Sequence, residues 1–157
     1  MKVELVVIGR TMSRYLQEGV DNYVKRLGHY VPLDITCLPD VKSTKSMTEE
    51  RQKELEGVQF LDYIKPGDRV MLLDEKGREM TSREFAGFMD RMMSIVPKRL
   101  LFIVGGPYGF SKSVYDRADG LLSLSKMTFS HEMIRLFFTE QLYRAMTILR
   151  GEPYHHD

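Results

Sequence analysis

The sequence contains no tryptophan, a single cysteine and no long apolar run. The lone cysteine, Cys37, excludes an intramolecular disulfide and a zinc ribbon, and its place at the end of a strand pattern predicts a small buried side chain. A membrane-spanning helix needs ~18 consecutive apolar residues, which are absent. The opening residues 1–5 carry two charges and resemble no signal peptide. These absences predict a cytoplasmic protein.

The sequence also lacks an excess of charge of either sign. It has 23 basic and 22 acidic side chains and a formal net charge of +1. A protein that binds nucleic acid through its overall field is more basic than this. Any nucleic-acid contact must therefore use a local basic surface or one supplied by a symmetric assembly.

Short apolar runs alternate with longer amphipathic stretches along the 157 residues. This alternation predicts one domain, 1–157, of the α/β class, with a mainly parallel sheet flanked by helices. Thr81 and Glu84 form a capping-box pattern at one helix start. The wide apolar face of the last helix predicts burial on two sides, as at a subunit interface. The expected strands are 3–8, 33–38, 69–74, 100–104 and 120–125, and the expected helices are 15–27, 48–64, 81–95, 113–118 and 131–149.

Three loops follow expected strands, after Leu73, Val104 and Leu124. Parallel sheets bind ligands beyond the carboxyl ends of their strands, so these loops are candidate ligand loops. Gly105 and Gly106 would let the backbone approach a ligand, although a tight turn explains them equally well. The segment from Leu124 to His131 is rich in small hydroxyls that suit a purine edge, or is a polar connection capped by Ser130.

One motif imitates a phosphate-binding loop. Residues 106–113 (GPYGFSKS) lack only the second glycine of that pattern, and residues 70–75 resemble the acidic strand that accompanies it. The missing glycine, the late position of the motif and the short chain argue against a P-loop nucleotidase, which we keep as an alternative.

Several polar residues lie on or after the last helix. His131 and Arg135 are one turn apart and share a face, which is either a solvated stripe or a functional one. The tail that contains Tyr154 and His155 is either frayed or ordered by packing. No side chains have metal-ligand spacing, so no metal is expected.

Taken in order, four segments resemble the SPOUT-class methyltransferases, and specifically the ribosomal large-subunit RNA (pseudouridine-N3)-methyltransferases. They are residues 72–77 (LLDEKG), 102–109 (FIVGGPYG), 124–131 (LSKMTFSH) and 138–145 (FTEQLYRA). The resemblance implies a C-terminal trefoil knot, a homodimer and S-adenosylmethionine bound in the knot. It implies that the donor contacts Leu73, Gly105, Gly106, Leu124, Ser125, Lys126, Met127, Thr128 and Phe129.

The chemistry implied is methyl transfer to a ring nitrogen whose imide proton must first be removed. In a pocket reached from the dimer interface, the candidate catalytic residues are His131, Arg135, Tyr154 and His155. A histidine is a plausible base, while a cation such as Arg135 or Arg144 would stabilise the anion or hold phosphate. His156 stands where relatives place Lys or Arg, which leaves the role of the tail open.

The resemblance also implies ribosomal RNA as partner. Because the net charge is near zero, we expect recognition of an assembled ribosome surface rather than free RNA. A protein that keeps the fold but only binds the ribosome is a further alternative. A candidate RNA face, or else a scattered solvated surface, consists of Arg10, Arg14, Lys25, Arg26, Lys42 and Lys45.

Overall fold

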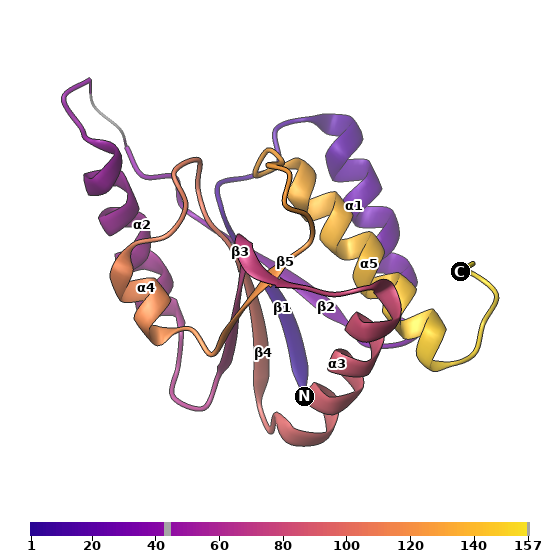
Figure 1. Cartoon of the computed structure of the whole chain (residues 1–157). Helices are drawn as coiled ribbons and strands as arrows, with labels where there is room; N and C mark the ends of the chain where they lie inside the picture. Colours follow the sequence, from indigo (N-terminus) through magenta and orange to yellow (C-terminus); the bar gives the residue numbers. More distant parts are fainter. Residues whose placement is uncertain (43–44, 157) are drawn as a thin grey trace.

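The sheet is parallel throughout, as predicted, and has the strand order β2-β1-β4-β3-β5 (Figure 1). The computed structural model describes residues 1–42 and 45–156, so part of the polar 40–47 segment and the last residue lie outside it. The elements are β1 (Lys2–Ile8), α1 (Arg14–Leu27), β2 (Leu33–Leu38), α2 (Glu49–Tyr63), β3 (Arg69–Glu79), α3 (Ser82–Ile95), β4 (Arg99–Val104), α4 (Lys112–Arg117), β5 (Gly120–Ser123) and α5 (Met133–Leu149).

Helices cover both faces of the sheet. Helices α1, α3 and α5 pack on one face, and α2 and α4 pack on the other (Figure 1). Alternation along β1 produces the two layers: Leu5 faces the α5 side, whereas Val6 faces the α2 side. The α/β class is therefore confirmed. In the described part of the chain, no helix is both long and apolar enough to cross a membrane.

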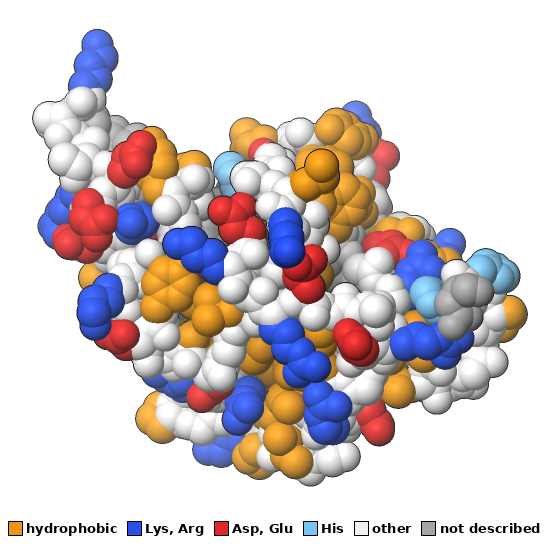
Figure 2. Space-filling view, in the orientation of Figure 1, with side chains coloured by type: hydrophobic (Ala, Val, Ile, Leu, Met, Phe, Trp, Pro, Cys, Tyr) orange, Lys and Arg blue, Asp and Glu red, His pale blue; other side chains and the backbone are white. Residues whose placement is uncertain are grey.

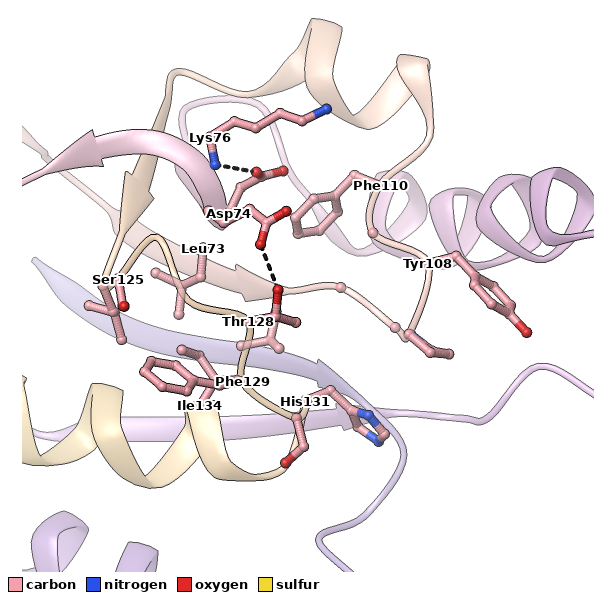
Figure 3. Close-up of a pocket in the computed structure, with 18 of the residues that line it drawn as sticks. Leu73, Asp74, Lys76, Tyr108, Phe110, Ser125, Thr128, Phe129, His131 and Ile134 are labelled. Carbon is pink, nitrogen blue, oxygen red and sulfur yellow. Dashed lines mark hydrogen bonds between the residues drawn. The ribbon is translucent and has the colours of Figure 1, made fainter.

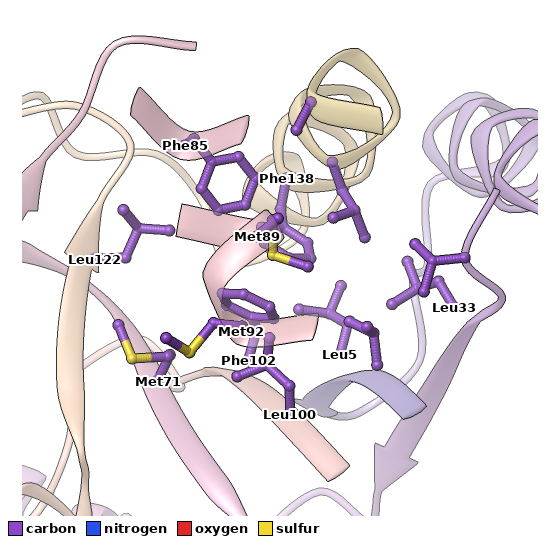
Figure 4. Packing of buried hydrophobic residues seen from close by; sticks show 14 of the residues in the cluster. Leu5, Leu33, Met71, Phe85, Met89, Met92, Leu100, Phe102, Leu122 and Phe138 are labelled. Atoms are coloured by element: carbon purple, nitrogen blue, oxygen red, sulfur yellow. The ribbon is translucent and has the colours of Figure 1, made fainter. Parts of the chain in front are cut away.

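The larger core lies under α3 and α5. Phe102 of β4 and Phe138 of α5 are fully buried, with ring centroids 4.6 Å apart. Phe85 of α3 packs edge-on against both rings (Figure 4). Burying each such side chain contributes about 1.5–3 kcal/mol.

The wide apolar face of α5 has an explanation within one chain. Helix α5 packs between α1 and α3, so both of its flanks are covered without a second subunit. The predicted burial on two sides is therefore confirmed, with neighbouring helices of the same layer as its cause, and a subunit interface on this helix stays a prediction. Phe137 and Leu149 remain exposed on this helix.

Local signals set several helix ends. Thr81 accepts a hydrogen bond from the Glu84 amide, and the Glu84 side chain accepts one from the Thr81 amide, so the capping box is confirmed. Helix α5 begins at Met133 rather than at His131. Ser130 still accepts a hydrogen bond from the Met133 amide, at 3.1 Å.

We expect Thr81→Ala to lower the free energy of unfolding by about 1 kcal/mol, because it leaves a helix N-terminal amide without its acceptor. Urea unfolding of the variant and the wild type measures the change. Ser82→Ala removes a hydroxyl that bonds Gln141 instead of the α3 amides, so it is the matched control. Equal midpoints for Thr81→Ala and the wild type would contradict the capping role.

Strand β3 runs further than predicted and pairs twice with β5. Residues 71–73 pair with 120–122, and after a four-residue interruption Arg78 and Glu79 pair with Leu122 and Ser123. A Cβ at Gly77 would lie 2.6 Å from the Leu121 carbonyl carbon, so only glycine lets the two backbones come this close. The trefoil knot that the resemblance implies stays a prediction.

The prediction for Cys37 is wrong, because this cysteine is exposed. It lies on β2, which is the edge strand of the sheet and is less covered than the central strands. The strand pattern did not reveal which strand is at the edge.

Candidate functional site

A cavity of about 700 Å³ opens at the carboxyl ends of the central strands. The three segments predicted as ligand loops form its walls: the residues after Leu73, where the pairing of β3 with β5 is interrupted, and the loops after β4 and β5. The volume is within the ~300–1,000 Å³ typical of small-molecule sites. Figure 3 shows Leu73, Ser125 and Phe129 gathered around this space.

Most of the residues expected to contact a methyl donor line this cavity. The exception is Lys126, whose ammonium lies 3.6 Å from Glu79 on the exposed surface. It is absent from the lining because its side chain leaves the loop on the outer side. The expected residues that line the cavity are Leu73, Gly105, Gly106, Leu124, Ser125, Met127, Thr128 and Phe129.

The loop after β4 is a tight glycine turn. Gly106 and Gly109 form an antiparallel bridge, and Gly109 has a φ of +86°, a conformation that favours glycine. Phe110 is buried against Phe60 of α2, which anchors the end of the turn. The glycines of the turn therefore present backbone to the cavity, while Tyr108 and Phe110 add side chains to its lining.

The first loop is held by its own acidic residues. Asp74 accepts a hydrogen bond from the Lys76 amide at 2.8 Å and another from the Tyr115 hydroxyl. Burial raises the pKa of Tyr115, and the hydrogen bond to Asp74 raises it further. The phenol thus stays protonated and keeps the loop attached to α4.

The third loop closes on the first. The Thr128 hydroxyl donates to Glu75 at 2.9 Å, one of the dashed contacts in Figure 3. Within the loop, Ser125 accepts a hydrogen bond from the Met127 amide at 3.0 Å. Phe129 packs on Phe137 of α5 with ring centroids 4.8 Å apart. These contacts hold the loop over the cavity.

Acidic side chains outnumber basic ones around the cavity. Glu49, Asp74 and Glu75 line it, together with one lysine, Lys76, and His131. The carboxylates favour a ligand that carries positive charge. Sequence reasoning did not assign these acids to the site. The sequence signal that could have identified them is the acidic pair Asp74 and Glu75 directly after a buried run. We instead compared residues 70–75 with the acidic strand of nucleotide-binding proteins.

Of the four candidate catalytic residues, the structure places only His131 in the cavity lining. Arg135 does not lie on a solvated stripe, because it is 2% exposed. Its guanidinium donates to the carbonyls of Ile8 and Gly9, both at 2.9 Å, and to the Thr11 hydroxyl at 3.0 Å. Helical periodicity could not show that the end of β1 packs against this position.

The tail residues Tyr154 and His155 fold back along α5 and lie beside Glu140 and Arg144. Tyr154 donates to Glu140 at 3.0 Å, and His155 Nδ1 lies 3.1 Å from Arg144. Glu140 and Arg144, which hold these two side chains, come nine and thirteen residues after His131, or about 14 and 20 Å along the helix. A single chain therefore does not bring Tyr154 and His155 to the cavity.

The nucleotidase-like motif has a different role in the structure. Lys112 is exposed and pairs with Asp116 at 2.8 Å, and it does not line the cavity. Ser111 caps α4 by accepting a hydrogen bond from the Val114 amide. The lysine that would grip phosphates thus faces solvent.

The basic residues proposed as one RNA face are dispersed. Arg14 begins α1, whereas Lys25 and Arg26 are in its last turn, about 16 Å away. Arg26 packs on the Tyr143 ring beside the tail, not beside the cavity. Figure 2 shows acidic and basic side chains interspersed on the face in view. Among the described residues, no cluster of His, Cys, Asp or Glu could hold a metal ion.

A parallel α/β sheet with a cavity built from the segments after its strands is typical of proteins that bind a small molecule. A family model described as "Predicted SPOUT methyltransferase" matches residues 1–155. The chain belongs to the SPOUT methyltransferase family, which implies a methyl donor.

Curated relatives match along the whole chain. Proteins named "Ribosomal RNA large subunit methyltransferase H" from Parabacteroides distasonis and Bacteroides fragilis are 54% and 53% identical over all 157 residues of both chains. The protein of that name from Christiangramia forsetii is 50% identical over 156 residues, 99% of each chain.

Proposed function

We propose that this chain transfers a methyl group from S-adenosylmethionine to N3 of a pseudouridine in large-subunit ribosomal RNA. The observation that carries the proposal is the cavity formed by the three loops, within a chain that shares about half its residues with ribosomal RNA methyltransferases. The membership of a methyltransferase family removes the nucleotidase alternative.

The cavity fits the donor in shape and charge. Leu73, Leu124 and Phe129 supply an apolar wall. Gly105 and Gly106 allow close backbone approach, as an adenosyl group requires. Carboxylates on the rim suit the cationic sulfonium and ammonium groups. The donor supplies an activated methyl group, so the protein mainly has to align the acceptor.

The acceptor nitrogen needs to lose its imide proton. His131 is at the end of the third loop and lines the cavity, and its side chain is exposed. Histidine is the side chain that most often serves as a general base, so His131 is the proposed base. A flipped-out nucleotide would reach it from the open side of the cavity.

Tyr154 and His155 require a second subunit to take part. In one chain they are held against α5 by Glu140 and Arg144. A homodimer in which the tail of one protomer approaches the cavity of the other would join them with His131. This arrangement keeps Tyr154 and His155 as proposed catalytic residues and makes the dimer the active form.

The substrate is proposed to be the assembled ribosome. The net charge is +1, and basic residues are dispersed, so electrostatic affinity for free RNA should be small. A shaped ribosomal surface would supply the missing specificity by contacts on several elements at once.

The test is transfer of labelled methyl from S-adenosylmethionine to ribosomes that lack the modification. We expect label in N3-methylpseudouridine with intact ribosomes, and little with naked ribosomal RNA. Equal labelling of naked RNA would contradict the ribosome requirement. Donor binding without any label would move the substrate elsewhere, and ribosome binding without donor binding would favour the non-catalytic factor.

A further inference from the structure

A buried carboxyl lies behind the glycine turn of the cavity. Glu56 is in α2 and is only 3% exposed, although glutamate is seldom buried without a charged partner. Its side-chain neighbours are neutral or acidic: the Gln52 amide lies 3.4 Å away, and Asp40 adds negative charge nearby. Burial raises the pKa of Glu56, an effect that the Gln52 and Gly106 amides oppose.

The Glu56 carboxyl touches the turn directly. A Cβ at Gly106 would lie 2.7 Å from the carboxyl carbon of Glu56, so the absence of a side chain makes this contact possible. The next residue on α2, Gly57, makes a second close contact that only a glycine allows. A Cβ at Gly57 would lie 2.5 Å from the Ser111 hydroxyl. Helix α2 therefore packs against both the turn and the cap of α4.

Gly106 separates the carboxyl from the cavity. Gly106 lines the cavity and Glu56 does not. Its carbonyl accepts a hydrogen bond from the Gly109 amide at 3.2 Å, while its own amide faces Glu56 and lowers the pKa of that carboxyl. Since Pro107 has no N–H, the Gly106 amide is the last backbone donor before Tyr108.

One carboxyl oxygen of Glu56 makes no hydrogen bond within the described part of the chain. Oε1 is buried and has no hydrogen-bond partner among the described residues. A buried acceptor without a partner is destabilising, and such groups occur where they serve a function. An aliphatic residue would meet the packing requirement of α2 without burying a polar group.

We infer that Glu56 is a positioning residue for the methyl donor: its carboxyl holds the Gly106 backbone from behind and fixes the turn in the conformation that binds the donor. This inference rests on the proposed function, which places S-adenosylmethionine in the cavity. Glu56 acts through Gly106 and does not itself contact the donor or the acceptor base.

The test compares Glu56→Ala, Glu56→Gln and Glu56→Asp in the full chain. Isothermal titration gives the dissociation constant for S-adenosylmethionine, and steady-state methylation of ribosomes gives kcat and the KM for the donor. We expect Glu56→Ala to raise both the dissociation constant and the KM about tenfold or more, with kcat at saturating donor nearly unchanged, because the carboxyl that packs against the Gly106 backbone is lost. Glu56→Gln keeps an acceptor of the same shape and should stay within about threefold of wild type.

Glu54→Ala is the matched control. Glu54 is on the same helix, but it pairs with Arg51 at the surface, so the donor constants should not change. If Glu56→Ala does not fold, Glu56→Asp decides, because its shorter side chain withdraws the carboxyl from Gly106. Donor binding by a folded Glu56→Ala or Glu56→Asp as tight as wild type would overturn the inference. Failure of the wild type itself to bind the donor would instead overturn the proposed function, and the inference with it.

Discussion

Gly105→Val is expected to weaken donor binding by up to about 100-fold while the protein stays folded. A Cβ at this position would already lie 3.2 Å from the Gly109 carbonyl oxygen and from the Phe110 ring. The two methyl groups of valine then have space only toward the cavity. Overpacking of this kind costs about 1–3 kcal/mol, which corresponds to a dissociation constant up to about 100-fold higher. Titration with S-adenosylmethionine measures the loss.

Gly87→Val is the control for the same substitution elsewhere. Gly87 is in α3, where an added Cβ would meet only an Arg91 nitrogen at 3.9 Å. Its donor affinity should equal that of wild type. The circular dichroism spectrum and the oligomeric state should be unchanged in both variants. Normal donor binding by Gly105→Val would show that the donor site has been placed incorrectly.

Arg135→Met is expected to lower the free energy of unfolding by about 3 kcal/mol or more, because two buried carbonyls lose their donors. Methionine fills much of the same space, but it cannot donate to Ile8 and Gly9. Burial lowers the pKa of the Arg135 guanidinium, because a buried site disfavours the charged form. Methionine avoids the cost of burying a charge, which offsets part of the loss. It does not offset the cost of leaving the buried carbonyls of Ile8 and Gly9 without hydrogen-bond donors. Urea unfolding measures the difference.

Arg150→Met is the control, because Arg150 is exposed after α5, where it donates to the His29 carbonyl and lies over the Tyr30 ring at 4.3 Å. It should change the free energy of unfolding by no more than about 1 kcal/mol. Unchanged stability of Arg135→Met together with lost methylation would contradict a structural role. That outcome would return Arg135 to the reaction as a catalytic cation.

Local sequence patterns predicted most of the strands and helices. The errors occur where a residue's contacts are with parts of the chain that are distant in sequence. The alternation in β1 and the capping box of Thr81 depend on residues close in sequence, so they could be recognised directly. The second half of β3 was missed because its polar residues pair with β5, which comes forty residues later in the chain. Cys37 was misjudged because edge position depends on strand order.

The sequence by itself determined the order of strands and helices along the chain, the capping box of Thr81 and the three segments, after Leu73, Val104 and Leu124, that line the cavity. These follow from periodicity and turn chemistry, which act over a few residues. Only the tertiary structure decided that Arg135 is buried and bonded to the carbonyls at the end of β1, and that Glu56 lies behind Gly106. It also decided that His131 is separated from Tyr154 within one chain. Those relations arise from packing between elements distant in sequence, and no local pattern encodes which side chains such packing brings together.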